Sequence, residues 1–159
     1  MHANMNVFKG FLKRDDIRFQ YDLAGGALMG MGTYGVSSLR LVFGEGPVEC
    51  LEAEASMVPG DPEEKCDEGF KGRWRFPNGR VGSIDADARR TVFGFLPWMT
   101  LPNVVVTHKP IAIAMEGGNG EVQECVKSVK LTMFAGPHFW HYVEVVDENT
   151  LELGLGVKC

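Results

Sequence analysis

The 159-residue sequence lacks a basic excess, a long apolar run and a closely spaced pair of cysteines. Its 16 Lys and Arg against 21 Asp and Glu give a net charge of −5, which argues against nucleic acid or an anionic membrane surface as a partner. No apolar stretch approaches the roughly 18 residues of a membrane span. The first residues lack the basic-then-apolar order of a secretion signal, so we expect a cytoplasmic protein.

The cysteines are scattered, and none has the C-x₂-C spacing of a zinc knuckle. They are Cys50, Cys66, Cys125 and Cys159. Without a secretion signal, we expect reduced, buried thiols. The rest of the composition, 45% hydrophobic and 23% charged residues, is that of a globular protein, and residues 1–159 fit one domain.

One long helix is expected over residues 23–43, where apolar residues recur with a period near 3.6. Asp22 is placed to cap its start, and Gly44 is placed to end it in a left-handed conformation. Gly30, Gly32 and Gly35 inside the helix would each cost about 1 kcal/mol relative to alanine. Packing against another element therefore has to compensate for them.

Strands are expected on both sides of this helix. Their ranges are 3–8, 48–57, 68–76, 80–91, 103–115, 121–134 and 140–146, with a ragged strand over 150–157. Alternation places Phe70 and Trp74 on one face of its strand and Lys71 and Arg73 on the other. The turns are expected at residues 77–79, which contain the hairpin signal Asn-Gly, and at 116–120. Residues 92–101 are interpreted as a packed aromatic loop.

One helix followed by about six hairpin-linked strands implies an α+β fold. The sheet is expected to be open and mostly antiparallel, with the helix on one face. A single helix leaves the other face bare, and monomers rarely expose apolar patches of that size. We therefore expect a partner to cover the open face.

Residues 30–35 form the pattern G-x-G-x-x-G, and Glu52 follows twenty residues after Gly32. This pattern is typical of a dinucleotide-binding loop, whose glycines let a pyrophosphate approach a helix N-terminus. The residues before Gly30 do not form a β-branched strand, however, and hairpins follow rather than alternating strands and helices. These two features weaken the dinucleotide interpretation.

His138 and His141 could share a metal ion if they lay on a helix. On a strand, positions i and i+3 point to opposite faces, and no third ligand is evident, so a structural or interface role is favoured. The dipeptide Lys109-Pro110 is interpreted as a bend in a strand.

Asp85 and Asp87 share one face of the expected strand, about 6.5–7 Å apart, a separation that resembles the paired carboxylates of a glycosidase. Ser83 and Arg89 lie on the same face. These neighbours favour a solvated or partner-facing surface over a catalytic pair.

The stretch from Asp22 to Tyr34, DLAGGALMGMGTY, resembles the signature of the Gfo/Idh/MocA oxidoreductases. That signature reads G-G-A-L-x-D-x-G-x-Y or G-G-x-x-x-D-x-G-x-H. The most similar branch is that of the dimeric dihydrodiol dehydrogenases and the NADP-dependent D-xylose dehydrogenases. Similar runs occur there in the same order as residues 66–68, 74–79 and 137–142, so the resemblance covers residues 1 to about 150.

The resemblance implies that the chain is the C-terminal α+β domain of such an enzyme, which follows a Rossmann domain. The open sheet of that domain shapes a sugar or diol pocket and commonly forms the dimer interface. The helix with the signature faces the nicotinamide of NADP. Tyr34 then corresponds to the family's proposed catalytic tyrosine, which acts as general acid/base or holds the substrate hydroxyl.

The sequence also departs from the family pattern. The aspartate of the signature is replaced by Gly30. The catalytic lysine belongs to an E-K-P run before the signature, whereas Lys109-Pro110 lies seventy-five residues after Tyr34. The Rossmann domain and the closing C-terminal helices are absent, so we expect a domain truncated at both ends that does not bind the cofactor tightly.

Two functions remain open. The first is the substrate-binding and dimerisation domain of an NADP-dependent oxidoreductase acting on a D-xylose-like sugar or a dihydrodiol, without turnover by this chain alone because hydride transfer needs a bound nicotinamide. The second is a catalytically inactive β-sheet module that forms a homodimer, or binds a paralogue, through its open sheet face.

Overall fold

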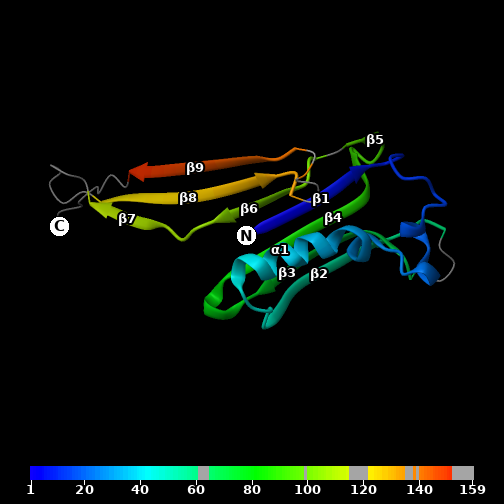
Figure 1. Ribbon diagram of the computed structural model, residues 1–159, viewed down its shortest axis with the longest axis horizontal. Coiled ribbons are helices and arrows are strands. Elements are labelled where there is room, and N and C mark those ends of the chain that lie inside the picture. Colours follow the sequence, from blue (N-terminus) through cyan, green and yellow to red (C-terminus); the bar gives the residue numbers. More distant parts are fainter. Residues whose placement is uncertain (61–64, 99, 115–121, 135–137, 139, 152–159) are drawn as a thin grey trace, which may run out of the picture.

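The computed structural model describes residues 1–60, 65–98, 100–114, 122–134, 138 and 140–151. Within them, nine strands form one open sheet, in the order β2-β3-β4-β1-β6-β8-β7, with β5 beside β4 and β9 beside β8 (Figure 1). The strands are β1 (His2–Phe8), β2 (Glu49–Met57), β3 (Asp67–Arg75), β4 (Val81–Val92), β5 (Leu96–Pro97), β6 (Asn103–Thr107), β7 (Ile111–Ala114), β8 (Val122–Thr132) and β9 (Tyr142–Leu151). The helical elements are the 3₁₀ turns η1 (Ile17–Phe19), η2 (Tyr21–Leu23) and η4 (Pro77–Gly79), the π-helical turn η3 (Leu28–Gly32) and α1 (Thr33–Phe43).

The expected α+β class with an open sheet and one helix is confirmed, but the estimate of about six strands is wrong. The sheet is mixed, because β1 runs parallel to β4 and antiparallel to β6. The expected strand over 103–115 is divided into β6 and β7. Proline has no N–H for the ladder, and Pro110 lies just before β7 begins at Ile111.

The helix is shorter than expected at its start and ends where expected. Ala24 and Gly26 have positive φ angles of 57° and 133°, which are incompatible with a right-handed helix. Asp22 lies in η2 and does not cap the helix. At the other end Gly44 takes φ 73°, and its N–H donates to the Arg40 carbonyl oxygen at 2.8 Å.

The helix glycines allow α1 to lie close against β1 and β4. A Cβ on Gly35 would lie 2.8 Å from Ile84 Cγ2, and one on Gly32 would lie 2.9 Å from Leu28 Cδ1. The core beneath consists of two clusters of buried residues: Ala3, Leu39, Phe76, Ile84 and Val104, and Ala27, Met31, Ala86 and Ala88. Close packing compensates for the low helix propensity of glycine.

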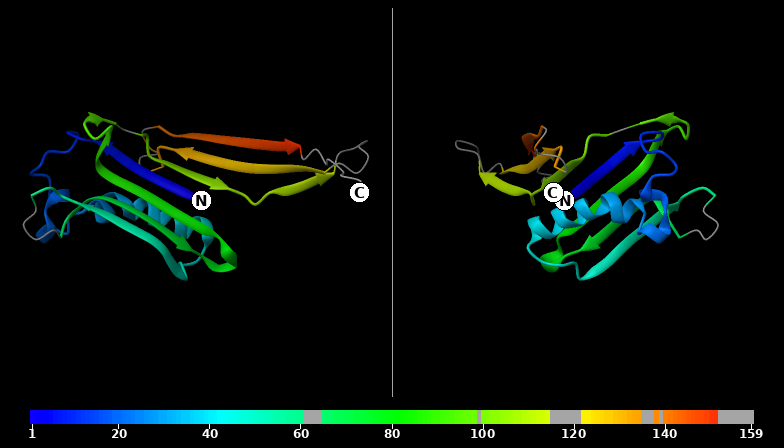
Figure 2. Two further views of the ribbon diagram at one scale, coloured as in Figure 1. Left: turned by 180° about the vertical axis from the view of Figure 1, so that it is seen from behind. Right: turned by 45° about the vertical axis from the view of Figure 1, so that its right-hand side comes forward.

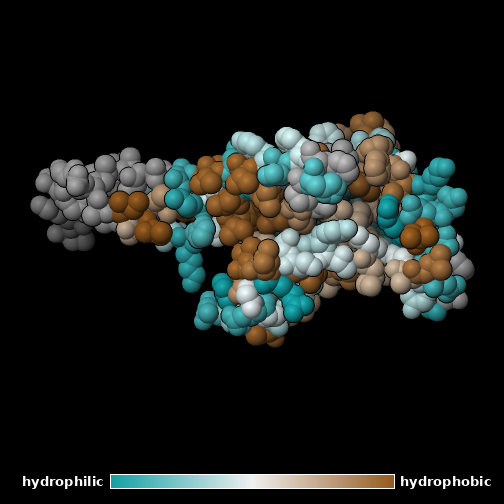
Figure 3. Space-filling model, viewed as in Figure 1, coloured by the Kyte–Doolittle hydropathy of each residue, from teal (hydrophilic) through white to brown (hydrophobic). Residues whose placement is uncertain are grey.

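The helix covers only part of its side of the sheet, because β7, β8 and β9 extend beyond it (Figure 2). Hydrophobic residues gather over β6, β8 and β9 beside α1 (Figure 3). Val143 and Val145 on β9 are 54% and 59% exposed there. An exposed apolar surface was expected on the face opposite the helix. Over β6, β8 and β9 it lies instead on the same face as α1.

The alternation predicted for β3 is confirmed, since Gly72 is buried while Lys71 and Arg73 are exposed. The turn at η4 is confirmed as well, with Asn78 at φ 63° and Gly79 at φ 71°. The aromatic loop after β4 is not packed as expected, because Phe93 is 83% exposed. The turn at 116–120, the ragged strand beyond residue 151, and residues 137 and 139 lie outside the described residues.

Candidate functional site

Tyr34 lies in the first turn of α1 on the side away from the sheet, with 46% of its surface exposed. Its carbonyl oxygen accepts a hydrogen bond from Ser38 Oγ at 2.9 Å. Among the described residues, its phenol hydroxyl has no hydrogen-bond partner. The phenol is therefore free to bind a hydroxyl group of a ligand.

Gly30 is exposed and lies in η3, four residues before Tyr34. A Cβ at this position would meet only the Arg18 side chain, at 3.6 and 3.7 Å, which is ordinary contact. The fold therefore does not require glycine here. An aspartate, as in the family signature, would lie beside the Arg18 guanidinium, which already contacts Asp16 Oδ2 at 3.7 Å.

The G-x-G-x-x-G pattern is part of η3 and α1 rather than a loop between a strand and a helix. Gly32 and Gly35 are buried against the sheet side of the helix, and the space that a Cβ would fill is already occupied by Leu28 and Ile84. The described residues at this pattern therefore do not fit the cradle of a dinucleotide pyrophosphate.

No strong charge lies on the helix near Tyr34. From Leu23 to Leu39 the sequence has no charged residue. The surface around the start of the helix combines exposed apolar and aromatic side chains, Ile17, Tyr21, Leu23 and Met29, with the exposed charges of Arg18 and Asp22. Such a mixed surface suits a small polar ligand that also has apolar carbon surface.

A second candidate surface lies on the face of the sheet opposite α1, where a groove of about 610 Å³ crosses β3, β4 and β1. Its polar lining includes Glu52, Lys71, Arg73, Ser83 and Asp85. His2 Nδ1 lies 2.9 Å from Ser83 Oγ in this groove. This groove and Tyr34 are on opposite faces of the sheet.

Desolvation lowers the pKa of the His2 imidazole below its ordinary value of 6.5. Asp85 acts in the opposite direction, and the amino group of Met1 adds to the lowering. The neutral imidazole is therefore favoured in the folded chain. In that form the ring forms a hydrogen bond with the Ser83 hydroxyl without adding a positive charge to the groove.

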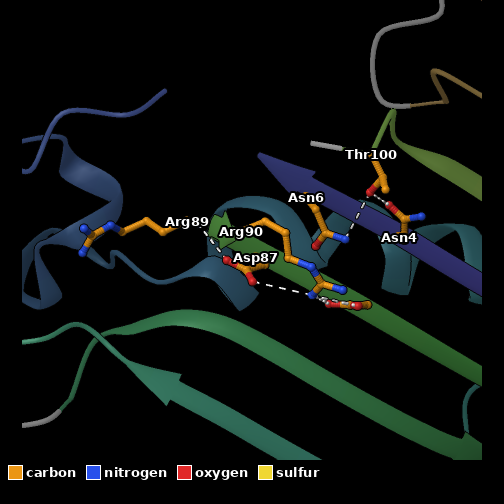
Figure 4. A network of polar contacts seen from close by, with 7 residues as sticks. Asn4, Asn6, Asp87, Arg89, Arg90 and Thr100 are labelled. Atoms are coloured by element: carbon orange, nitrogen blue, oxygen red, sulfur yellow. Dashed lines mark hydrogen bonds and ion pairs between the residues drawn. The ribbon is translucent and has the colours of Figure 1, made fainter. Parts of the chain in front are cut away.

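Asp85 and Asp87 share one face of β4, as expected, but they are not a free pair of carboxylates. Arg90 Nη1 lies 3.2 Å from Asp85 Oδ2 and 3.6 Å from Asp87 Oδ2 (Figure 4). Asp87 Oδ1 also accepts the backbone N–H of Arg89 at 2.8 Å. The guanidinium and the backbone thus occupy the oxygens that a glycosidase pair would need free.

Next to this pair, Asn6 on β1 is 2% exposed. Its Nδ2 donates to Thr100 Oγ1 at 3.4 Å, and Thr100 donates to Asn4 Oδ1 at 3.1 Å (Figure 4). Asn6 Oδ1 has no partner among the described residues. These contacts tie the chain before β6 to β1.

His138 and His141 are both exposed, and each has a contact within the chain. Among the described residues, no group of three or more His, Cys, Asp or Glu side chains could hold a metal ion. Lys109-Pro110 separates β6 from β7, as the bend interpretation predicted. No helix in the described part of the chain is long and apolar enough to cross a membrane.

Sequence reasoning missed two residues that shape these surfaces. Asp67 accepts the N–H of Leu28 at 2.8 Å, and Arg90 bridges the two aspartates. Alternation on β4 placed the two aspartates on one face. No local pattern could have identified Arg90, because it follows a shift in the register between β1 and β4.

The family described as GFO/IDH/MocA C-terminal domain matches residues 1–93, more than half of the chain. No curated protein matches the sequence. Among solved structures, the chain is similar to the aldose-aldose oxidoreductase from Caulobacter crescentus complexed with glycerol, with a TM-score of 0.53 and 17% identity over 94% of this chain. The chain spans 36% of that oxidoreductase chain, and the likeness at this identity shows the fold alone.

The matched residues include the signature helix with Tyr34 and strands β1 to β4, which form both candidate surfaces. The structural neighbour has the same open sheet over nearly all of the chain. The chain therefore belongs to the GFO/IDH/MocA family of oxidoreductases and corresponds to its C-terminal domain.

Proposed function

We propose that this chain is the substrate-binding domain of an NAD(P)-dependent oxidoreductase that acts on a sugar or a related diol. The observation that carries the proposal is the half-exposed Tyr34 phenol, without a partner among the described residues, at the tyrosine position of the family signature. Tyr34 would bind and orient a substrate hydroxyl. Family membership supports the reaction class, and the signature's resemblance to the xylose and dihydrodiol dehydrogenases supports NADP and a D-xylose-like substrate or a dihydrodiol.

The proposal assigns binding rather than hydride transfer to this chain. Gly32 and Gly35 are used for packing, so the described residues offer no pyrophosphate cradle. Gly30 supplies no carboxylate beside Tyr34. With NADP⁺ and D-xylose, we expect no formation of reduced cofactor by this chain alone, because proximity to a bound nicotinamide is needed. Steady turnover, measured by absorbance, would contradict this division of roles.

The test of the binding role is an NMR titration of the ¹⁵N-labelled chain with D-xylose and with glycerol. We expect weak, saturable shifts, with Kd on the order of millimolar, confined to backbone amides of η3 and the start of α1. Tyr34→Phe should weaken binding by about fivefold to tenfold, the value of one hydrogen bond. Tyr142→Phe is the matched control, because Tyr142 is equally exposed, at 50%, but lies on β9.

Shifts that are unchanged in Tyr34→Phe, or that map to β9, would overturn the assignment of Tyr34. The absence of any saturable shift at η3 and α1 would overturn the substrate-binding role itself. The first outcome contradicts only the role of Tyr34, whereas the second contradicts substrate binding at this surface altogether.

A second candidate function is association without catalysis, through the face opposite α1, as a homodimer or with a paralogue. Gly30 in place of the signature aspartate supports it. Light scattering across a dilution series tests it, since a dimer should dissociate with dilution. A dilution series that starts at about 100 μM would detect even a weak specific dimer. A monomer at every concentration in that series would count against this function.

A further inference from the structure

A groove of about 700 Å³ lies at the C-terminal end of α1, whereas Tyr34 lies in the first turn of that helix. Three parts of the chain line it: the last residues of α1, the end of η4 with the start of β4, and the segment between β6 and β7. That segment lies beside the end of α1 (Figure 1). The volume is within the range of about 300–1,000 Å³ that is usual for sites of small organic ligands.

The floor of the groove is apolar and continuous with the core. Phe43 and Val106, which line the groove, both pack against the buried cluster that includes Leu39 and Phe76. The Phe43 ring contacts the Phe76 ring, at 4.3 Å between centroids, and the Arg80 guanidinium lies 5.2 Å from the Phe43 centroid. Because the core holds these side chains, the groove is formed before any ligand binds.

Apolar side chains also reach solvent in this groove. Val42 and Ile111 line it and are 43% and 60% exposed. They belong to α1 and β7, so two separate elements contribute the exposed apolar surface. Such surface in a concave site favours a ligand with a hydrocarbon or aromatic body.

The charge of the groove is positive, in a chain whose net charge is −5. The described residues that line it include Arg80, His108 and Lys109 and contain no Asp or Glu. Arg80 Nη2 lies 3.0 Å from Glu45 Oε1, so an acid outside the lining already neutralises this base. Lys109 is exposed and has no ion-pair partner among the described residues. It therefore offers a free positive charge beside the apolar floor.

The backbone around Lys109 is held while its side chain stays exposed. The N–H of His108 donates to the Lys127 carbonyl oxygen on β8 at 2.9 Å. Pro110, on the other side, has no N–H and interrupts the strand. In the part of the chain that the structure describes, the exposed imidazole of His108 has no hydrogen-bond partner. Two neighbouring polar side chains are thus available to one ligand group.

We propose that this groove binds a small molecule with a carboxylate group on an apolar body, as in a medium-chain fatty acid. The carboxylate pairs with Lys109 and accepts a hydrogen bond from His108, and the hydrocarbon lies against Val42 and Ile111. The site is separate from Tyr34, because Val42 follows eight residues later, about 12 Å along the helix axis. The proposal therefore goes beyond the sugar-binding role and does not depend on it.

The test is an NMR titration of the ¹⁵N-labelled chain with sodium octanoate and with 1-octanol, its uncharged counterpart. Octanoate should give saturable shifts, with a Kd on the order of millimolar, at amides of residues 42–43, 79–81 and 106–111. 1-Octanol should bind at least about threefold more weakly, because it has no charge to pair with Lys109. The sugar titration is read at η3 and the start of α1, so the two results are independent.

Removal of the charge should weaken octanoate alone. Lys109→Gln is expected to raise the octanoate Kd about threefold to fivefold, the value of an exposed ion pair, and to leave the 1-octanol Kd unchanged. Lys71→Gln is the matched control, because Lys71 is also exposed and unpaired among the described residues but lies on β3. It should change neither Kd.

A second position tests the apolar part of the groove. Ile111→Glu should raise the octanoate Kd at least about tenfold, because a like charge then faces the carboxylate. Ile111→Gln has the same size without the charge and should cost less. Since Ile111 is 60% exposed, both variants should fold. No saturable shift at these amides, equal binding of octanoate and 1-octanol, or a Kd that Lys109→Gln and Ile111→Glu leave unchanged would overturn the proposal.

Discussion

Asp67, the first residue of β3, accepts a hydrogen bond through Oδ2 from the backbone N–H of Leu28 at 2.8 Å. Leu28 begins η3, so a carboxylate from the sheet satisfies one of the N–H groups that a helix start leaves unpaired. A Cβ on Gly26 would collide with Oδ1 of the same carboxylate. Strand β3 thus holds the start of the helix that carries Tyr34.

Removal of this cap should destabilise the fold. Asp67→Ala is expected to lower the free energy of unfolding by about 1–2 kcal/mol, the usual cost of losing an N-terminal cap. Asp67→Asn keeps an acceptor oxygen and should cost less. Asp22→Ala is the control, since Asp22 lies in η2 away from the helix start, and its change should stay within about 0.5 kcal/mol. Urea denaturation measures all three, and a larger loss at Asp22 would refute the assignment.

The glycines of the G-x-G-x-x-G pattern should respond differently to the same substitution. Gly35→Ala places a methyl group 2.8 Å from Ile84 Cγ2 in a buried contact, which should cost about 1–3 kcal/mol. Gly30→Ala meets only the flexible Arg18 chain and should stabilise the helix by about 0.5–1 kcal/mol. Thermal unfolding of both variants is the measurement. Equal effects would mean that α1 does not lie against the sheet as described.

The sequence allowed prediction of the features that depend on neighbouring residues. The end of α1 follows from Gly44, and the two faces of β3 follow from alternation at Lys71 and Gly72. The start of the helix could not be predicted, because its cap, Asp67, is 39 residues away in the chain. The parallel pairing of β1 with β4 likewise joins residues about eighty positions apart, such as His2 and Ser83.

The candidate sites can likewise be separated into features that the local sequence indicated and features that depend on strand register. Tyr34 was identified by resemblance to a family signature, and the structure adds that its side chain is exposed. The pairing of Glu52 on β2 with Arg73 on β3 could not be recognised, because it depends on the register of the two strands. The aspartates of β4 were found by alternation, but their neutralisation by Arg90 depends on a local register shift.

Loss of the Arg90 side chain should expose the repulsion between the two aspartates. Arg90→Met leaves Asp85 and Asp87 without their guanidinium and should cost about 1–2 kcal/mol of unfolding free energy. Asp85→Asn in the same background should recover part of the loss. Arg75→Met is the control, because its pair with Glu49 is about half exposed and should contribute at most about 1 kcal/mol. A cost at Arg75 equal to that at Arg90 would contradict the network.

His2 should make stability depend on pH below neutrality. Its pKa in the folded chain lies below 6.5, chiefly because of desolvation, so the unfolded chain binds the proton more readily. The stability that His2 contributes is present above about pH 6.5 and is lost as the pH falls from there toward the folded pKa. The melting temperature of the wild type should therefore fall more between about pH 7.5 and 5.5 than that of His2→Gln. An equal or steeper fall in the variant would contradict the desolvation of the His2 imidazole.

In the exposed hairpin after β4, one substitution is expected to stabilise the fold rather than to destabilise it. Phe93 is 83% exposed and has φ 56°, a left-handed conformation that is strained for a bulky side chain. Phe93→Asn fits that conformation and should raise the unfolding free energy by about 0.5–1 kcal/mol. Phe95→Asn is the matched control, because Phe95 is 69% exposed but has no positive φ, so no gain is expected. A gain at both positions, measured by urea denaturation, would attribute the effect to lost aromatic surface rather than to backbone strain.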